Sequence, residues 1–404
     1  MDKSEKKSDK FDWTLTLILL ILFLVSCAAI YSAQNTGQYE ENFLFKQIFW
    51  YIVGAGIISV TMFFDSEDFQ KLAWIFYGFG VLLLVALFLA PSGIAPYING
   101  AKSWFIIEPI GSIQPSEFMK IFLVIALSRA IVSHNQHTDV KTIKSDLSLF
   151  LKLGFITALP LGLIMLQPDL GTALVVLSIF TGLILVSGIS WKIILLVYGS
   201  GATLGSWLIY MVIWKPEFLQ KYLHVKTYQF GRIYAWLDPE SYQDSTGYHL
   251  VKSLMAIGSG TIMGKGPGER QVYLPESHTD FIFSVIGEEY GFIGGSIVIC
   301  TFFMLIYHLT RTALDTLEPF NTYICTGVIS MITFHVFQNI GMTIQVLPIT
   351  GIPLPFISYG GSSLMGNMLA MGLIYSIRFH HRTYMFSSRA GPRRQFNPGK
   401  GFGA

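Results

Sequence analysis

The chain carries little charge for its length. Aspartate, glutamate, lysine and arginine make up only 13% of its 404 residues, whereas hydrophobic residues make up 52%. Soluble domains average about 25% charged residues. Together with a mean hydropathy of +0.53, this composition excludes an ordinary soluble domain. We expect no nucleic-acid partner.

Cysteine is also scarce. The three cysteines, Cys27, Cys300 and Cys325, all fall within apolar runs. They form neither a disulfide framework nor the spacing of a metal site, and they are best explained as small buried apolar residues. The sequence therefore predicts no metal-ligating residues.

Long apolar runs are abundant instead. A helix needs about 20 predominantly apolar residues to cross a bilayer. The sequence therefore predicts an all-α polytopic membrane protein with about ten transmembrane helices. A short interruption at 167–171 reads either as a kink or as a hairpin between two spans. The runs begin near Trp13, Leu44, Lys71, Pro115, Leu149, Leu170, Trp191, Phe281, Phe320 and Phe356.

The distribution of lysine and arginine predicts the orientation. Short cytoplasmic loops retain positive charge, so the basic ends and one basic loop predict that both termini are cytoplasmic. The long segment 214–279 is also basic, but loops of this length escape the rule. We expect it to form a large extracellular loop between helices 7 and 8. The basic residues used here are Lys3, Lys6, Lys7, Lys10, Arg129, Lys141, Lys144, Lys152, Arg378, Arg382, Arg389, Arg393, Arg394 and Lys400.

The membrane part shows no internal repeat and reads as one domain. We expect a cytoplasmic tail at 1–12, a single transmembrane domain at 13–386 that includes the outer loop 214–279, and a tail at 387–404. This last segment is rich in Gly, Arg and Pro and has too little apolar surface to fold alone. We expect it to be disordered and cytoplasmic, with arginines available to anionic lipids.

Ionisable residues gather at the predicted outer face. Glu117 and Lys120 open the fourth span at a spacing that places them on one helix face. Asp169 lies in the outer turn before the sixth span. Asp280 begins the eighth span, and Glu288 lies roughly 12 Å further along it at 1.5 Å per residue. This clustering predicts an outward-facing polar site in a helical bundle.

Each of these residues also has a purely structural explanation. Glu117 and Lys120 fit a packing ion pair and a ligand site equally well. Asp169 is best explained as the N-cap of the sixth span. Glu288 and Glu289 are adjacent and must point in different directions, so at most one faces a shared cavity, and we favour Glu288.

Asp280 has the weakest structural explanation, because Thr279 could cap the helix without it. A carboxylate near an apolar surface has a raised pKa and can accept a proton near neutral pH. Asp280 is therefore the candidate general base. His278 stands two residues away, but two such residues without further clustered ligands are a poor metal signature.

Three outer loops supply further candidates. The glycine-rich segment 258–268 lacks the spacing of a P-loop, although its backbone could present N–H groups to an anion beside Lys265 and Arg270. Lys102 stands near Trp104 in a second loop that fits an interfacial anchor or a contact with a lipid-linked substrate equally well. The loop 351–363, which contains Ser358, breaks regular helix at two prolines and is expected to line a cavity.

Five ordered motifs together resemble the SEDS family of shape, elongation, division and sporulation proteins. They are QPSEFMK at 114–120, QPDLG at 167–171, GSGTIMGKGPG at 258–268, PESHTDFIFSVIGEEYG at 275–291 and TGIPLPFISYGGSS at 350–363. Their spread covers nearly every predicted span. The motifs TGIPLPF and NIGMTIQVLP resemble the elongation (RodA) branch of the family more than its division (FtsW) branch.

The resemblance implies a peptidoglycan glycosyltransferase at the outer face of a bacterial plasma membrane. It implies that lipid II is polymerised into a nascent glycan strand, and that a class B penicillin-binding protein supplies transpeptidation. Asp280 matches the family's essential loop aspartate. Cations are expected near the departing pyrophosphate, in the order Lys120, Lys102, Lys265 and Arg270. The resemblance leaves open whether a divalent cation, Mg or Mn, assists the reaction.

Two alternatives belong to other functional classes. A lipid II flippase would place its polar path through the bilayer centre, whereas the ionisable cluster is predicted in the outer half. The polar exceptions are His335, Gln338 and Asn339, which interhelical hydrogen bonds could explain. A noncatalytic scaffold for a transpeptidase would leave the outer carboxylates without chemistry.

Overall fold

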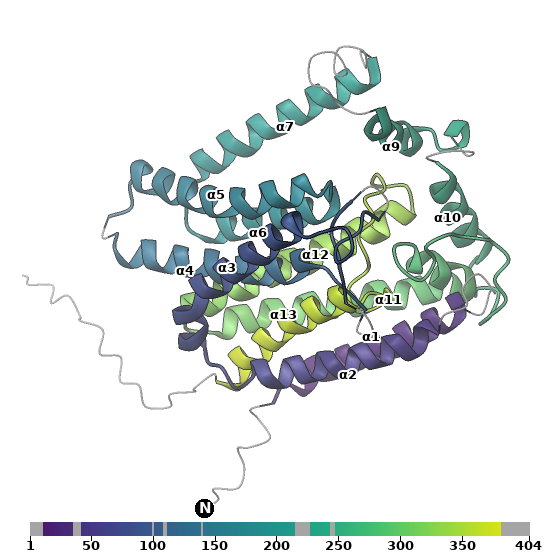
Figure 1. Cartoon of the computed structure of the whole chain (residues 1–404), viewed down its shortest axis with the longest axis horizontal. Helices are drawn as coiled ribbons and strands as arrows, with labels where there is room; N and C mark the ends of the chain where they lie inside the picture. Colours follow the sequence, from purple (N-terminus) through teal and green to yellow (C-terminus); the bar gives the residue numbers. More distant parts are fainter. Residues whose placement is uncertain are drawn as a thin grey trace, which may run out of the picture.

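The computed structural model describes residues 11–34, 42–98, 101–107, 111–138, 140–214, 227–242 and 247–380. These residues form a bundle of ten long helices with a few short elements at one end (Figure 1). The long helices are α1 (Trp13–Gln34), α2 (Phe43–Thr61), α3 (Ser66–Leu89), α4 (Pro115–Gln136), α5 (Ile143–Leu166), α6 (Leu170–Val186), α7 (Trp191–Trp214), α11 (Ile282–Asp315), α12 (Pro319–Thr343) and α13 (Gly361–Phe379).

The all-α membrane fold that the sequence predicts is confirmed, although the exact number of spans stays a prediction. Seven helices are long and apolar enough to cross a membrane: α1, α2, α3, α5, α7, α11 and α12. Helix α6 is apolar but shorter. Helices α4 and α13 are less apolar, and most of their residues are buried in the bundle. A helix that faces protein instead of lipid can carry polar groups. A hydropathy criterion can therefore miss α4 and α13 as membrane-crossing helices.

The start of α6 is fixed by its cap. The Oδ1 atom of Asp169 accepts a hydrogen bond from the N–H of Thr172 at 2.9 Å, which satisfies one of the unpaired donors at the helix N-terminus. Helix α5 ends at Leu166 and packs against α6. The interruption at 167–171 is therefore a hairpin turn, and the predicted capping role of Asp169 is confirmed.

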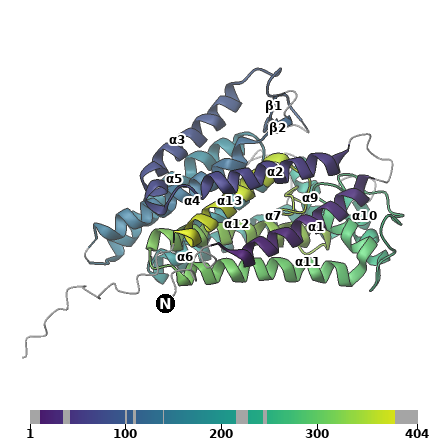
Figure 2. The ribbon, with the colours of Figure 1, turned by 90° about the horizontal axis from the view of Figure 1, so that it is seen from below.

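The two ends of the bundle differ. At one end, which we call the hairpin end, lie the antiparallel strands β1 (Phe105–Ile107) and β2 (Gly111–Ile113) and the starts of α2 and α11 (Figure 2). The described part of the predicted outer loop 214–279 also lies here. It contains α9 (Thr227–Leu237), the 3-10 helix η2 (Glu240–Tyr242) and α10 (Tyr248–Ser259). This segment is therefore largely structured where it is described.

The opposite end, which we call the terminal end, joins the start of α1 to the ends of α11 and α13. The Oγ1 atom of Thr16 lies 2.7 Å from the hydroxyl of Tyr375, and Asp12 pairs with His308 at 2.6 Å. The described chain thus begins and ends on one side of the bundle, as two cytoplasmic termini require. The predicted tails at 1–12 and 387–404 lie outside the described residues, apart from Phe11 and Asp12.

Helix α11 is broken at Gly291, which has φ 60° and ψ −156°. The glycine-rich loop 258–268 packs into the break and replaces the lost helical hydrogen bonds. A side chain at 291 would place its Cβ atom 2.4 Å from the nitrogen of Gly264, so only glycine fits. The replacement bonds run from Lys265 N to Glu288 O, from Gly266 N to Glu289 O, from Phe292 N to Thr261 O and from Ile293 N to Ile262 O, at 3.0 to 3.2 Å.

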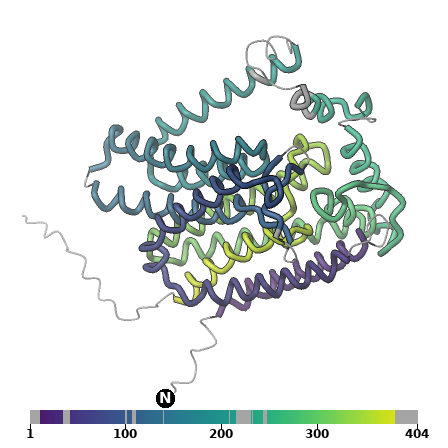
Figure 3. The backbone as a smooth tube through the Cα atoms, in the orientation of Figure 1, coloured from purple at the N-terminus to yellow at the C-terminus, as the bar shows by residue number. Residues whose placement is uncertain are grey.

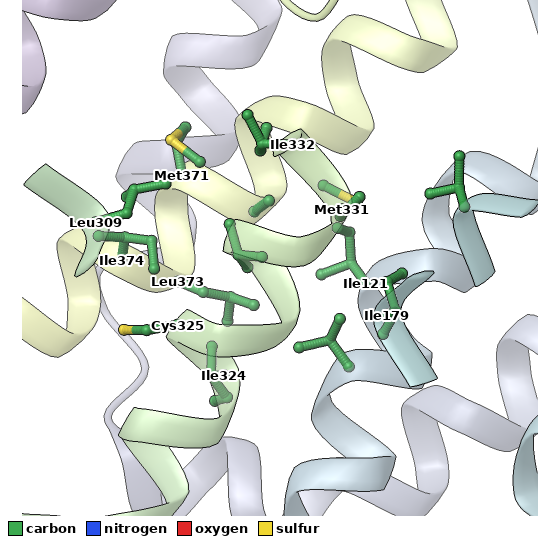
Figure 4. Packing of buried hydrophobic residues seen from close by; sticks show 14 of the residues in the cluster. Ile121, Ile179, Leu309, Ile324, Cys325, Met331, Ile332, Met371, Leu373 and Ile374 are labelled. Carbon is green, nitrogen blue, oxygen red and sulfur yellow. The ribbon is translucent and has the colours of Figure 1, made fainter. Parts of the chain in front are cut away.

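The core lies between α4, α6, α11, α12 and α13. Figure 4 shows part of it, where apolar side chains from these helices interdigitate around α12. Helix α7 by contrast runs along the outside of the bundle (Figure 3), and few of its residues are buried. The core is thus concentrated on the helices that also supply the polar cavity described next.

Candidate active site

A cavity of about 940 Å³ opens at the hairpin end. Its walls come from the first turns of α2, α4 and α6, from the β1–β2 region, from the turn before α11, from α12 and from the loop 351–363. The sequence predicted that this last loop lines a cavity, and Gly351, Ile352 and Pro353 do so. Four acidic side chains face the cavity: Glu117, Asp169, Glu276 and Asp280.

The backbone around Asp280 is held by the helices and loops behind it. The Nδ2 atom of Asn339 donates to the carbonyl of Asp280 at 2.8 Å and to that of Ile352 at 2.8 Å. The hydroxyl of Ser358 donates to the carbonyl of Thr279 at 2.6 Å. Ser358 therefore acts behind the cavity wall. These contacts hold the position of Asp280 through main-chain carbonyls.

Gly351 lies directly beside the Asp280 carboxylate. A Cβ atom at this position would stand 3.3 Å from Oδ2 of Asp280, and Gly351 has φ 74°. A positive φ of this size disfavours any residue with a side chain. The glycine thus lets the main chain of the loop 351–363 approach the Asp280 carboxylate closely.

Glu117, Lys120 and His335 form a buried polar group at the floor of the cavity. The Nζ atom of Lys120 lies 2.9 Å from each carboxylate oxygen of Glu117 and 3.1 Å from Nε2 of His335. The side chain of Lys120 is only 2% exposed, and Glu117 and His335 line the cavity. Lys120 therefore acts on the cavity through these two neighbours.

The tautomer of His335 follows from its contacts. Its Nδ1 atom lies 2.7 Å from the carbonyl of Met331, and a carbonyl only accepts, so Nδ1 carries the proton. Nε2 then offers a lone pair to the ammonium of Lys120. The sequence indicated His335 only as a polar residue in a span, because the partner on α4 is 215 positions away.

Replacing His335 by leucine should destabilise the protein, whereas glutamine should be tolerated. Leucine removes an acceptor from a buried ammonium, and a hydrogen bond to a charged group contributes about 1.5 to 3 kcal/mol. Glutamine keeps an oxygen acceptor. Thermal unfolding of His335→Leu, His335→Gln and wild type in the same detergent checks this. Equal melting of the leucine variant and wild type would contradict the assigned contact.

Asp169 combines capping with a place in the cavity wall. Its Oδ2 atom accepts hydrogen bonds from Thr172 Oγ1 at 2.7 Å and from Gln114 Nε2 at 3.0 Å. Gln114 also lines the cavity, which sequence reasoning did not predict for it. The QPSEFMK and QPDLG motifs thus meet in space, although 53 positions separate their first residues.

The two candidates of the loop before β1, Lys102 and Trp104, have different positions relative to the cavity. Trp104 lines the cavity. Lys102 instead donates to the carbonyl of Phe88 at 3.1 Å and to that of Ala90. It therefore satisfies carbonyls at the C-terminal end of α3, a common role for lysine.

Lys265, Arg270 and Glu288 lie apart from the cavity, together with Glu289. We call these four residues the glycine-loop cluster. Glu288 is fully buried and lies 2.8 Å from Nζ of Lys265. Its Oε1 atom also accepts from the N–H groups of Gln271 and Val272 at 2.8 and 3.1 Å. The cluster thus fastens the segment before Asp280 to the break in α11.

Glu289 contacts α1 and also the segment before Asp280 that Glu288 holds. It contacts the hydroxyl of Ser32 on α1 and accepts from the N–H of Gly268 at 3.1 Å. Neither glutamate is among the cavity-lining residues. The preference for Glu288 as the cavity-facing member therefore has no support in this geometry.

The described residues contain no group of three His, Cys, Asp or Glu side chains arranged to hold a metal ion.

Another histidine near the site, His249 on α10, stacks on Phe281 with ring centroids 5.8 Å apart. Burial lowers the pKa of His249, against the raising effect of the Glu276 carboxylate. His249 thus favours its neutral form beside the turn that carries Asp280.

This arrangement is suited to acid and base chemistry on a polar group. Carboxylates from α4, from the start of α6 and from the turn before α11 line the cavity, and the main chain of Asp280 is held by Asn339. Proton transfer by a positioned carboxylate is a standard means of activating a hydroxyl. The aromatic side chains of Phe45, Phe49, Trp50 and Trp104 add apolar surface to the same cavity.

Comparison with known proteins gives a consistent result over most of the chain. The family model described as "Cell cycle protein", FTSW_RODA_SPOVE, matches residues 8–383. Peptidoglycan glycosyltransferase RodA of Treponema pallidum is 32% identical, covering 91% of this chain and 97% of that protein. Stage V sporulation protein E of Bacillus subtilis is 31% identical, covering 92% and 98%.

Solved structures give the same result. The structure of the rod shape determining protein RodA of Thermus thermophilus has a TM-score of 0.65 and 25% identity, covering 92% of this chain and 97% of that one. A chain from a peptidoglycan synthase complex, described as coordinating polymerization and crosslinking, has a TM-score of 0.74 and 27% identity. That match covers 92% of this chain and 99% of the other.

Proposed function

This chain belongs to the family of FtsW, RodA and SpoVE and is a peptidoglycan glycosyltransferase, and we propose that it polymerises lipid II with Asp280 as general base. The observation that carries the proposal is the position of Asp280, fixed by its main chain at the edge of a polar cavity. The cavity is large enough for part of a drug-sized or larger ligand, since ligand sites commonly measure about 300 to 1,000 Å³.

In the proposed reaction the two substrates meet beside Asp280. The carboxylate accepts the proton of the acceptor sugar hydroxyl while that oxygen attacks the anomeric carbon of the donor. The bond from the anomeric carbon to the pyrophosphate oxygen breaks, and undecaprenyl pyrophosphate leaves with the electron pair. A single displacement inverts the sugar configuration. Glu117, held by Lys120, supplies an acceptor for further substrate hydroxyls.

We propose that the reaction takes place at the outer face of the bacterial plasma membrane during cell elongation. The charge pattern of the loops supports the outer location of the hairpin end. The TGIPLPF and NIGMTIQVLP motifs support the elongation branch. Overall sequence identity does not distinguish the branches, because the identities to RodA and FtsW relatives are equally high, at 31 to 32%. The assignment to elongation thus depends on motifs and not on overall similarity.

We further propose a class B penicillin-binding protein as the partner that crosslinks the nascent glycan strand. One similar structure comes from a peptidoglycan synthase complex, which supports an assembly with a transpeptidase. Helices with widely exposed apolar faces, such as α7, have surface for membrane lipids and for a membrane-anchored partner. The scaffold alternative assigns no role to the carboxylates of the cavity and is less well supported.

A lipid II flippase is less consistent with the cavity floor. Toward the terminal end from His335, α12 continues through buried apolar residues that pack against α4, α6 and α13 (Figure 4). A translocation path for a charged headgroup needs polar or hydrated lining across the bilayer. In the described part of the chain, this apolar layer closes the cavity below His335. Labelled residues of the layer are Ile121, Ile179, Ile324, Cys325, Met331, Ile332 and Leu373.

The test uses the purified full chain with a class B penicillin-binding protein and labelled lipid II in detergent, with and without Mg²⁺ or Mn²⁺. We expect glycan strands resolved by length on a gel. The same preparation in vesicles with lipid II in one leaflet tests translocation. Lipid II transfer between leaflets without any polymer in either assay would refute the proposal and favour the flippase.

A further inference from the structure

We propose that Lys46 binds the pyrophosphate of the lipid-linked substrate at the membrane-facing mouth of the cavity; this inference rests on the proposed function. Among the described residues that line the cavity, the basic side chains are Lys46 and His335. His335 uses its two nitrogens on Met331 and Lys120. Lys46 is the lysine or arginine among the described residues of the cavity wall.

The cations that the sequence indicated for this role lie elsewhere. Lys120 is buried between Glu117 and His335. Lys102 donates to two carbonyls after α3. Lys265 and Arg270 belong to the glycine-loop cluster, and none of the four lines the cavity. A pyrophosphate in the cavity would need a different cation.

Lys46 stands where the cavity meets the lipid-facing surface of α2. Lys46 and Trp50 are four residues apart and share one helix face. Phe45 and Phe49 form the neighbouring stripe and are 71% and 49% exposed. All four side chains line the cavity, and Trp50 packs beside Gly111 and Gly361. The aromatic stripe thus forms a mouth whose outer side is apolar and whose inner side carries a cation.

The order of chemical groups across this mouth matches that of the substrate. The interior offers carboxylates that accept hydrogen bonds from sugar hydroxyls. Lys46 comes next, and the exposed aromatics beyond it suit a polyprenyl chain. In a lipid-linked sugar the pyrophosphate lies between the sugar and the hydrocarbon. A lysine ammonium is a compact charge that pairs well with phosphate oxygens.

The test measures binding and does not require turnover. Undecaprenyl pyrophosphate, undecaprenyl phosphate and undecaprenol are each titrated onto the full chain in a nonionic detergent. The variants are Lys46→Met and Lys46→Arg. Lys71→Met is the matched control, because Lys71 is an exposed lysine that pairs with Glu67 on α3 and does not line the cavity.

We expect Lys46→Met to weaken binding of undecaprenyl pyrophosphate about tenfold or more, since one charge-assisted contact is lost. Undecaprenol binding should not change. Lys46→Arg should stay within about threefold of wild type because it keeps the charge, and Lys71→Met should match wild type. Raising the salt concentration should narrow the gap between wild type and Lys46→Met.

Wild-type affinity in Lys46→Met, or an equal loss for undecaprenol, would overturn the inference. These results are separable from those of the polymerisation assay. A chain that makes glycan while Lys46→Met binds normally refutes only the role of Lys46. A chain that binds the pyrophosphate lipid through Lys46 but makes no glycan supports Lys46 and refutes the proposed reaction.

Discussion

Asp280→Asn should lower the rate of glycan polymerisation by about 10²- to 10⁴-fold, the usual contribution of a positioned general base. Asparagine has nearly the same shape but cannot take up the proton of the acceptor hydroxyl. The fold should not change, because Asn339 holds position 280 through its main-chain carbonyl. Initial rates at saturating lipid II, with equal amounts of folded enzyme, measure the effect.

Glu276→Gln is the matched control for this experiment. Glu276 lines the same cavity and its Oε2 atom accepts a hydrogen bond from Thr279 Oγ1 at 3.0 Å. If Asp280 alone is the base, Glu276→Gln should keep most of the activity. A wild-type rate for Asp280→Asn would remove Asp280 from the mechanism. Equal losses in both variants would mean that the cavity needs its total charge and not one base.

Lys120→Met should destabilise the protein by about 3 to 5 kcal/mol, the usual cost of leaving one member of a buried ion pair without its partner. Glu117 is 5% exposed, so its carboxylate would lose its counter-charge with little access to water. Activity should fall as well, because Glu117 faces the cavity. Thermal unfolding and initial polymerisation rates of the same preparation report the two effects.

The double variant Glu117→Gln with Lys120→Met separates stability from function. Removing both charges of a buried pair is often close to neutral for stability, so the double variant should melt closer to wild type than Lys120→Met does. It should nevertheless stay inactive if the Glu117 carboxylate contacts substrate. Full activity of the double variant would show that the pair serves packing alone.

Several features of the site could be predicted from the sequence because they depend on local rules. Apolar run lengths indicated the membrane bundle, and the N-cap preference of aspartate indicated Asp169. Prolines in the loop 351–363 indicated irregular backbone beside a cavity. The closeness of Glu117 and Lys120 followed from their spacing on one helix. Each of these inferences uses residues within one continuous segment of the chain.

The remainder depends on contacts between distant segments. The contact between Lys120 and His335 joins α4 to α12, and no local sequence pattern predicts it. Glu288 was expected to face the cavity along a regular helix, but the break at Gly291 and the inserted loop 258–268 surround it with Lys265 and main-chain donors. No sequence motif indicated Lys46, since its position in the cavity wall depends on how α2 packs beside the loop 351–363.

The break in α11 also bears on how the chain is made. Four main-chain groups, two before and two after Gly291, form hydrogen bonds with the loop 258–268. Unpaired backbone groups are costly in hydrocarbon. Translation proceeds from the N-terminus, so the ribosome always completes this loop before it synthesises α11. The loop that supplies the hydrogen-bond partners is therefore already synthesised when the broken helix enters the membrane. With the reverse order of the two segments, the backbone groups at the break would stay unpaired until the loop was made.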